Sequence, residues 1–402
     1  MGGMRIVRTL AVIVVVGIAA ACAGGPSKPP VASGHVRLFE ATGNEIVVID
    51  SQTHFAVRHL PLGIPSPDWR HLYSIKGTAL VDADPATGLT ISTLRLPGQF
   101  QLPAATSDGL PGGMSHGGAW LVAQAFDGAA THFLIVSTLE MRVAKDVNLP
   151  GRFNFDAISD DGLRLYLIQY LDGREYYVRL FNVASSTLDE NIVVDKSNGE
   201  QSMTGTRLSG IATRDGGWLF SMYVRESENP FVHVLSLDGP FAFCLDLPGK
   251  GFGSSAAEKH WSIAMDRPGD VVYAFNGSTG VVVQIDNSQQ FNPQVRRTAQ
   301  LASGSFGNVG SNSAVVSPDG RWLIAAASSG VVWVDTRTLT AHVRALPDWH
   351  VWSLALSPAA GELYAVSDTG RIADLDLASG RVISTFDANE SQPIALMRAV
   401  SV

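Results

Sequence analysis

The sequence predicts an all-β chain that closes into a ring of four-stranded blades, a β-propeller. Three observations lead to this prediction. A strand pattern that ends in aspartate recurs along the chain, a Ser-Pro-Asp-Gly type of turn keeps step with it, and the two ends of the chain each supply part of one further blade. Helical periodicity is nearly absent, which argues against a TIM barrel or a Rossmann arrangement.

The first repeated element is an apolar run that ends in Asp, with Thr or Ser often following three residues later. Its clearest copies are residues 47–53 (VVIDSQT) and 332–338 (VWVDTRT), and weaker copies bring the number to eight. An aspartate at a strand end can accept hydrogen bonds from backbone N–H groups two residues on and close a tight turn. We therefore interpret these acids as structural.

The second repeated element is a turn between two strands, which is clearest at residues 316–323 (VSPDGRWL). Together the two elements define a unit of four short antiparallel strands. A lone four-stranded sheet cannot bury both of its faces, so such units must stack, and a closed ring leaves only short, protected edges. Related turns lie at residues 66–69, 159–162, 213–218, 266–269 and 357–361.

The ends of the chain predict how the ring closes. The N-terminal part supplies only three strands, at 36–41, 45–50 and 56–60, and the C-terminal residues 394–400 supply a lone strand. Their sum is one complete blade. This composite gives eight blades, but the innermost strand before Trp69 looks truncated, so seven blades remain an alternative.

These residues resemble the YVTN/WD40-like β-propeller repeat family, whose units carry a V-x-V-I-D-x-x-T strand and an S-P-D-G turn. The resemblance spans residues 35–402. It implies the fold and says little about function, since this architecture hosts binding proteins, lactonases and quinoproteins alike.

The N-terminus has the layout of a bacterial signal peptide. Arg5 and Arg8 precede an apolar run, 10–21, that is too short to be a convincing membrane span. Residues 19–22 (AAAC) resemble the lipobox at which bacterial lipoproteins are cleaved and acylated, although the family prefers Leu where Ala19 stands. We predict removal of residues 1–21, lipidation of Cys22 and a flexible tether to residue 34. A conventional signal peptide with a chance cysteine is the alternative.

Composition excludes several classes of function. The formal net charge is −8, and it becomes more negative when Arg5 and Arg8 leave with the signal peptide. No Lys/Arg cluster larger than a pair is present, which argues against nucleic acid as a partner. With Cys22 acylated, the mature chain has one free cysteine, Cys244, so no intramolecular disulfide can form. No His or basic residue lies near Cys244 in sequence to lower its pKa, which predicts an inert thiol.

One stretch imitates a hydrolase motif. Residues 113–117 (GMSHG) fit the G-x-S-x-G pattern of a nucleophile elbow. That elbow requires a helix after the serine, whereas the residues from Ala119 onward alternate like a strand. We therefore interpret Ser115 as part of another turn of the S-P-D-G type.

Candidate ligand contacts come from the positions where the repeats differ. Each inner strand carries a small residue at the same position, and the side chain just before it differs from blade to blade. In propellers, this end of the inner strand opens onto the funnel, which is the mouth of the central channel. Two indoles with a few polar groups predict a ligand pocket. In the alternative interpretation the tryptophans plug the channel and the histidines are solvated. The predicted contacts are Trp261, Trp352, His260, His350, Arg207 and Asn312.

No metal or cofactor is predicted, because His260 and His350 lack a third ligand and any helical spacing. The leading functional hypothesis is a lipid-anchored, extracytoplasmic protein of the cell envelope. It would act as a non-enzymatic binding or scaffold propeller, with a protein or a small molecule as its ligand. The alternative is a propeller enzyme of lactonase-like or quinoprotein-dehydrogenase-like type. A third possibility is a rigid spacer without a ligand.

Overall fold

The computed structural model describes residues 1, 35–171, 174–195, 202–289, 292–301, 313–327, 330–357, 361–387 and 392–401. All sheets belong to Gly34–Val402, which forms one compact unit. The predicted signal peptide, Cys22 and the tether lie outside the described residues. Within the described part of the chain, no helix is long and apolar enough to cross a membrane.

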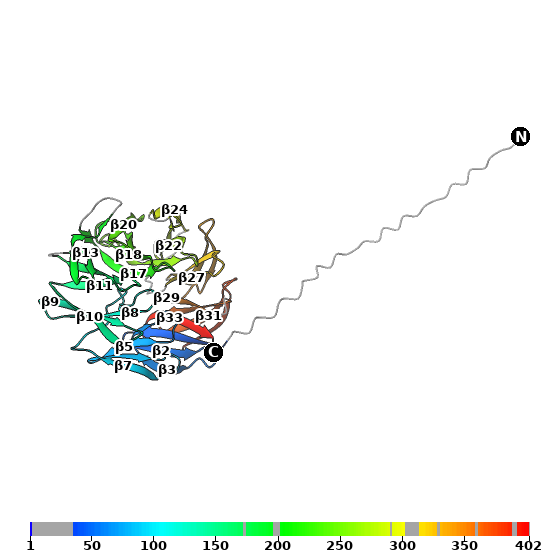
Figure 1. Ribbon diagram of the computed structural model, residues 1–402. Helices are drawn as coiled ribbons and strands as arrows, with labels where there is room; N and C mark the ends of the chain where they lie inside the picture. Colours follow the sequence, from blue (N-terminus) through cyan, green and yellow to red (C-terminus); the bar gives the residue numbers. More distant parts are fainter. Residues whose placement is uncertain are drawn as a thin grey trace. The chain divides into compact units, whose positions relative to one another are not determined.

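Eight antiparallel sheets form the blades of a ring, in which the strands from the two ends of the chain, blue and red, lie side by side (Figure 1). Blade 1 contains β33 (Pro393–Ser401), β1 (Val36–Thr42), β2 (Glu45–Asp50) and β3 (Ala56–Pro61). Blade 2 contains β4 (Ile64–Pro65), β5 (Leu72–Lys76), β6 (Ala79–Ala83) and β7 (Thr90–Arg95). Blade 3 contains β8 (Trp120–Phe126), β9 (Ala130–Ser137) and β10 (Arg142–Pro150). Blade 4 contains β11 (Phe153–Ile158), β12 (Arg164–Tyr170), β13 (Glu175–Asn182) and β14 (Thr187–Ile192), and β16 (Met203–Thr204) pairs with β13.

Blade 5 contains β17 (Thr206–Ala212), β18 (Trp218–Val224), β19 (Phe231–Ser236) and β20 (Phe241–Asp246), and β15 (Val194–Asp195) pairs with β20 in parallel. Blade 6 contains β21 (Trp261–Met265), β22 (Val271–Asn276), β23 (Val281–Asp286) and β24 (Gln294–Gln300). Blade 7 contains β25 (Ala314–Val316), β26 (Trp322–Ala327), β27 (Gly330–Asp335) and β28 (Thr340–Ala345). Blade 8 contains β29 (Val351–Leu356), β30 (Glu362–Ser367), β31 (Arg371–Asp376) and β32 (Val382–Asp387).

The two ends of the chain share blade 1, as the sequence predicts. β33 is the innermost strand of this blade and pairs antiparallel with β1, from Val36 opposite Ser401 to Thr42 opposite Pro393. The expectation of eight blades is thereby confirmed, and the seven-blade alternative is wrong. The strand before Trp69 is indeed short, since β4 has two residues, but it still completes blade 2.

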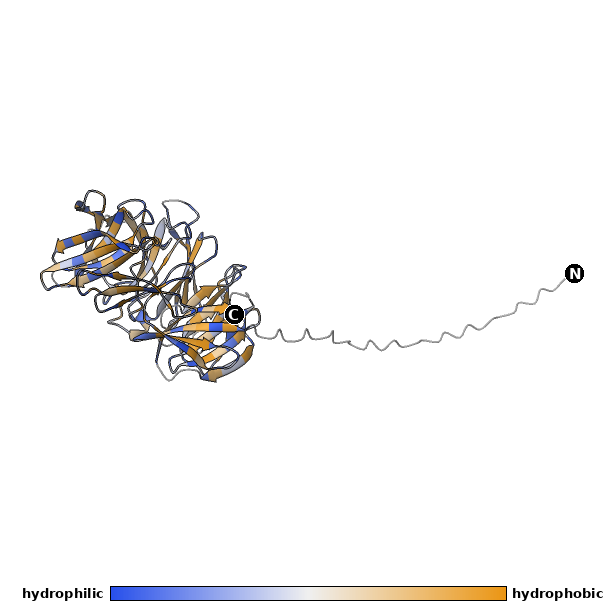
Figure 2. Cartoon of the chain, turned by 60° about the horizontal axis from the view of Figure 1, so that its bottom comes forward, coloured by the Kyte–Doolittle hydropathy of each residue, from blue (hydrophilic) through white to orange (hydrophobic). Residues whose placement is uncertain are grey.

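Burial follows from the stacking of blades. Middle strands such as β2 and β19 are buried along almost their whole length, because each of their faces meets a neighbouring blade. Outer strands such as β7 alternate between half-buried and exposed residues, because only one face is covered. Val36 and Leu38 of blade 1, for example, pack with Tyr364 and Val366 of blade 8. Figure 2 shows the hydrophobic residues, in orange, concentrated in the strands.

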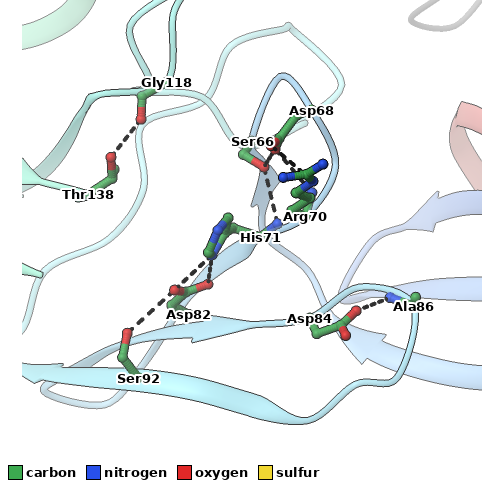
Figure 3. Close-up of polar contacts among 10 residues, drawn as sticks. All are labelled: Ser66, Asp68, Arg70, His71, Asp82, Asp84, Ala86, Ser92, Gly118 and Thr138. Atoms are coloured by element: carbon green, nitrogen blue, oxygen red, sulfur yellow. Dashed lines mark hydrogen bonds and ion pairs between the residues drawn. The ribbon is translucent and has the colours of Figure 1, made fainter.

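The repeated turn residues make the bonds that the sequence predicts (Figure 3). Ser66 Oγ donates to Asp68 Oδ1 at 2.6 Å and accepts from the backbone N–H of His71 at 3.1 Å. Asp84 Oδ1 accepts from the N–H of Ala86 at 2.7 Å. The same pattern recurs at Asp335, whose Oδ1 accepts from two backbone N–H groups at 2.9 Å. The structural role predicted for these aspartates is confirmed.

Two other aspartates occupy equivalent middle-strand positions in surroundings that differ. Asp82 of β6 lies 2.9 and 3.0 Å from His71 Nδ1 and accepts from Ser92 Oγ at 3.4 Å (Figure 3). Asp374 of β31 is 2% exposed, and its Oδ1 has no hydrogen-bond partner among the described residues. Burial, together with the nearby acids Glu362 and Asp376, raises the pKa of Asp374 to about 7.

We expect the substitution Asp374→Asn to stabilise the protein above neutral pH. The unfolded carboxyl titrates near 3.8 and the folded one near 7. Between these values the folded state therefore holds a proton that the unfolded chain releases, and stability falls as the pH rises. At pH 8 the substitution should raise the free energy of unfolding by on the order of 3 kcal/mol, with little change at pH 4.

Urea unfolding at the two pH values measures this effect. The matched control is Asp84→Asn. Burial raises the pKa of Asp84, but hydrogen bonds from Ala86 and Thr87 outweigh it and lower that pKa, so this variant should lose stability at pH 8. An equal gain for Asp374→Asn at both pH values would show that Asp374 is not a buried charge.

Candidate functional site

A cavity lies among the inner strands of the ring, and we call it the central channel. Its volume is about 720 Å³. It runs along the whole length of the inner strands. In β21 it reaches from the first residue, Trp261, to the last, Met265, and in β29 from the second residue, Trp352, to the last, Leu356. Its walls are the inner strands of blades 5 to 8 and of blade 1, so five blades contribute to one cavity.

A hairpin enters this channel from the long connection between β7 and β8. Ala104 pairs with Pro111, and the N–H of Ala105 donates to the carbonyl of Leu110 at 2.7 Å. We call residues 104–111 the channel hairpin. In blade 3 the inner strand is reduced to two isolated bridges to β8, Gln101 with Gln124 and Met114 with Leu121. The residues that would have extended this strand are used in the hairpin instead.

The channel hairpin spans the axis of the ring. At its tip, the N–H of Ser107 donates to the carbonyl of Leu208 in blade 5 at 3.2 Å. Leu110 packs against Ala41 and Ala395 of blade 1. Blades 1 and 5 are opposite each other in a ring of eight, so the hairpin divides the axial space. A smaller cavity of about 190 Å³ lies among the hairpin, β4 and blades 4 and 5.

A short helical turn shapes one end of the main cavity. The 3-10 helix η1 (Ala256–Lys259) leads directly into β21. It places Lys259 and His260 on the cavity, where the Lys259 ammonium lies 4.3 Å from the centre of the Phe252 ring. His260 Nδ1 is hydrogen-bonded to Ser278 Oγ. We call the end of the cavity formed by Lys259, His260, Trp261 and Trp352 the channel mouth.

The two tryptophans of the channel mouth differ in their packing. Trp261 is 3% exposed and packs with Phe220 and Met222 of blade 5, and its indole N–H has no described partner. Trp352 is half-buried, and its indole N–H donates to the carbonyl of Ile394 at 2.9 Å, across to β33. Both line the cavity, but only Trp352 leaves a substantial part of its indole accessible to a ligand.

Basic groups outnumber acids along the cavity. Among the described lining residues, Lys259, His260 and Arg398 face a single acid, Asp108 of the channel hairpin. The Arg398 guanidinium lies 5.2 Å from the centre of the Trp69 ring. Burial lowers the pKa of Arg398 and the nearby Asp68 opposes this, but a guanidinium stays charged in proteins. The cavity therefore combines apolar walls with a positive bias that favours an anionic guest.

Of the six side chains predicted to meet at the funnel, the structure brings Trp261, Trp352 and His260 together on the main cavity. Asn312 lies outside the described residues. His350 lines neither cavity: its side chain is 67% exposed and lies 3.6 Å from the Asp368 carboxylate. Because β29 begins only at Val351, His350 belongs to the loop before it, and its contact with a funnel ligand stays a prediction.

Arg207 is also displaced from the predicted position, since it lines the smaller cavity. Its Nη1 donates to Oδ1 of the buried Asp156 of blade 4 at 2.9 Å. The next residue, Leu208, occupies the position equivalent to Trp261 and Trp352 and lines the main cavity in blade 5. Arg207 pairs instead with the neighbouring blade.

The hydrolase-like motif is a turn, as predicted. Ser115 is 2% exposed, its Oγ accepts from the N–H of Trp120 at 3.2 Å, and the strand β8 follows. Gly113 has φ +103°, and a Cβ there would lie 2.5 Å from the carbonyl oxygen of Val122. Backbone geometry therefore explains this glycine without a catalytic role.

Cys244 has a neighbour that its sequence surroundings do not reveal. Strand pairing places His233 opposite it, with Nδ1 at 3.5 Å from Sγ. Complete burial lowers the pKa of His233, although the charge of Asp156 opposes this. A neutral imidazole provides no positive charge to stabilise a thiolate. The structure therefore supports an unreactive thiol, for a reason different from the one expected.

Sequence reasoning missed the channel hairpin and the charged residues of the cavity, Lys259, Asp108 and Arg398. One signal could have indicated the hairpin: the connection from β7 to β8 is 24 residues long, more than a compact domain normally needs. No comparable signal marks Arg398, because its place on the channel depends on how β33 closes the ring.

Eight blades around an axial cavity define this chain as an eight-bladed, WD40-like β-propeller. No family model matches the sequence, and no curated protein matches it. Among solved structures, dihydro-heme d1 dehydrogenase NirN in complex with DHE is similar, with a TM-score of 0.56 and 14% identity over 92% of this chain and 77% of that one. The Cps50 (Swd1) β-propeller domain of Myceliophteria thermophila has a TM-score of 0.44 and 10% identity over 87% and 100%. At such identities the likeness concerns the fold alone.

Proposed function

We propose that the protein is a non-enzymatic binding protein of the bacterial cell envelope, anchored by a lipid on Cys22, and that it takes a small organic anion into its channel mouth. The observation that carries the proposal is the meeting of two indoles with Lys259 and His260 on one cavity. The cavity volume lies in the range of small-molecule sites, which are commonly about 300–1,000 Å³. The similar structure of dihydro-heme d1 dehydrogenase is a complex, so a protein of this fold can hold a ligand.

The chemistry of the channel mouth defines the class of ligand. The face of Trp352 offers apolar area at low entropic cost, as tryptophans at binding hot spots do. Lys259 supplies an exposed ammonium beside it, and Asp108 is the one acid among the described lining residues. A ligand with an aromatic or alicyclic body and a carboxylate or sulfonate group satisfies both features.

The contribution of Trp352 can be tested with 8-anilinonaphthalene-1-sulfonate, an aromatic sulfonate that fluoresces when bound. Trp352→Ala should weaken its binding by about thirtyfold, since removing a hot-spot tryptophan costs about 2 kcal/mol. Trp349→Ala is the matched control. Trp349 is half-buried, stacks under Arg371 and does not line the cavity, so its removal should leave the affinity unchanged.

Because Trp352 also bonds to β33, thermal unfolding of each variant must accompany the titration. Trp352→Phe keeps an aromatic face and loses only the N–H, so it should retain most of the affinity. Full affinity of a folded Trp352→Ala variant would refute the proposed site.

The preference for an anion is tested separately with N-phenyl-1-naphthylamine, which lacks the sulfonate. Wild-type protein should bind the sulfonate more tightly than this neutral analogue. Lys259→Gln should reduce that difference, whereas Lys76→Gln, at an exposed lysine outside the cavity, should not. Equal affinity of wild-type protein for both probes would contradict a site for anions.

A further inference from the structure

The topology places the channel mouth and the start of the folded domain on opposite faces of the ring. In each blade the strands alternate in direction, so the turns between first and second strands and between third and fourth strands lie on one face. His35, just before β1, belongs to this face, because its Nε2 lies 2.6 Å from Oδ2 of Asp50, the last residue of β2. We call it the entry face. The channel mouth is at the other ends of the inner strands.

The entry face carries the most exposed apolar side chains of the described domain. Apart from Met1, three large apolar residues exceed two thirds exposure: Phe55 at 71%, Leu89 at 69% and Leu139 at 92%. Each lies in the turn between the third and fourth strands of its blade, and the three blades, 1 to 3, are consecutive. Side chains of this kind, grouped on one face, mark an interaction surface.

The turns that carry Phe55 and Leu89 adjoin each other. Arg58 Nη1 of β3 donates to the carbonyl of Ala86, in the turn that holds Leu89. The exposed Val57 and Ile91 are the second residues of β3 and β7, two positions after Phe55 and Leu89. Exposed apolar side chains therefore gather on neighbouring turns of blades 1 and 2.

The position of the chain entry indicates what covers this patch. Cys22 is joined to the domain at His35, on blade 1, by the segment 23–34. His35 follows Cys22 by 13 positions, so the chain between them spans at most about 45 Å. A lipid on Cys22 would therefore hold the entry face close to the bilayer. The guanidinium groups of Arg70 and Arg142 are exposed near the patch, and each is paired with an adjacent acid, Asp68 and Glu140 respectively.

We propose that the entry face of blades 1 to 3 rests on the bilayer, with Phe55, Leu89 and Leu139 seated in its interfacial region and the channel mouth turned away from the membrane. This inference rests on the proposed lipid anchor. Apolar side chains at this depth add to the binding supplied by the acyl chains and fix the orientation of the domain. The channel mouth then faces ligands that arrive from outside.

The orientation is tested on the acylated full-length protein in vesicles of equal parts phosphatidylethanolamine and phosphatidylglycerol, with bromine on the acyl chains as a quencher. Phe55→Trp and Leu89→Trp each add one indole to the entry face. The matched control, Phe126→Trp, adds one at the last residue of β8, on the opposite face, where Phe126 is 51% exposed. The emission of the parent protein is subtracted from each.

About half of the added emission should be quenched at positions 55 and 89, because interfacial indoles lie within reach of the acyl chains. The indole at position 126 should keep its emission. Equal quenching at all three positions, or none at positions 55 and 89, would overturn the proposed orientation.

A second measurement separates this surface from the anchor. Residues 34–402, which form one compact unit, are added to the same vesicles without any lipid attached. Their partition should fall roughly tenfold or more in the double variant Phe55→Ser, Leu89→Ser, and should be unchanged in Phe126→Ser. If the full-length protein proves not to be acylated, this measurement still decides the surface: identical partition of all three proteins would refute it. A soluble dimer that the double variant abolishes would also refute it, by showing that a second copy covers the patch.

Discussion

Deleting residues 392–402 should abolish the folded state. These residues contain β33, which pairs with β1 along its whole length and buries Ala395, Leu396 and Ala399. The deletion leaves β1 as an open edge inside the ring, and Trp352 and Ser353 lose their partners on β33. The cost should approach the whole stability of a domain, about 5–15 kcal/mol, because closure is what allows every blade to bury both faces.

Circular dichroism melting and size-exclusion chromatography measure this effect, with aggregation expected through the exposed edge. A circular permutant that carries residues 392–402 before His35, through a short Gly/Ser linker, is the matched control. Ser401 already pairs with Val36, so this permutant restores the complete blade and should recover most of the stability. If the truncated chain melts like the intact one, the closure does not hold the ring together.

Replacing Cys22 by serine should release the protein from the membrane. A bacterial lipoprotein carries several acyl chains on its cysteine, and each buried CH₂ contributes about 0.8 kcal/mol of binding, so their loss should reduce membrane binding by many orders of magnitude. The apolar patch of the entry face alone offers only a few side chains. We expect wild-type protein expressed in a bacterium to incorporate labelled palmitate and to sediment with membranes, and Cys22→Ser to incorporate none.

Cys244→Ser is the matched control, since Cys244 is the other cysteine of the chain and lies within blade 5. It should retain both the label and the membrane association. Wild-type protein without label, or a Cys22→Ser variant that remains in the membrane fraction, would contradict the anchor.

The parts of the fold that could be predicted from the sequence depend on local chemistry. Asp84 and Asp335 accept hydrogen bonds from backbone two and three residues away, so the turn and its residues are adjacent in the chain. The same holds for Ser66, Asp68 and the start of the following strand. The number of blades followed from counting such units and from adding the incomplete ends.

The candidate site was predicted only in part, because its residues meet through the ring. Trp261 and Trp352 occupy equivalent positions in their blades and do line one cavity. In blade 5 the equivalent position is held by Leu208, and Arg207, one residue earlier, pairs with Asp156 of blade 4. The sequence of one strand does not show which acid of the neighbouring blade lies within reach, because that contact forms only when the blades stack.

By itself the sequence determined the blade repeat, the closure by both chain ends and the structural role of the turn aspartates, since each depends on residues within a few positions or on the alternation along one strand. Only the tertiary structure decided the division of the channel by residues 104–111, the cations that face it and the position of Phe55 and Leu89 on the face opposite the channel mouth. These features arise where distant segments meet, and their geometry depends on the closed ring as a whole.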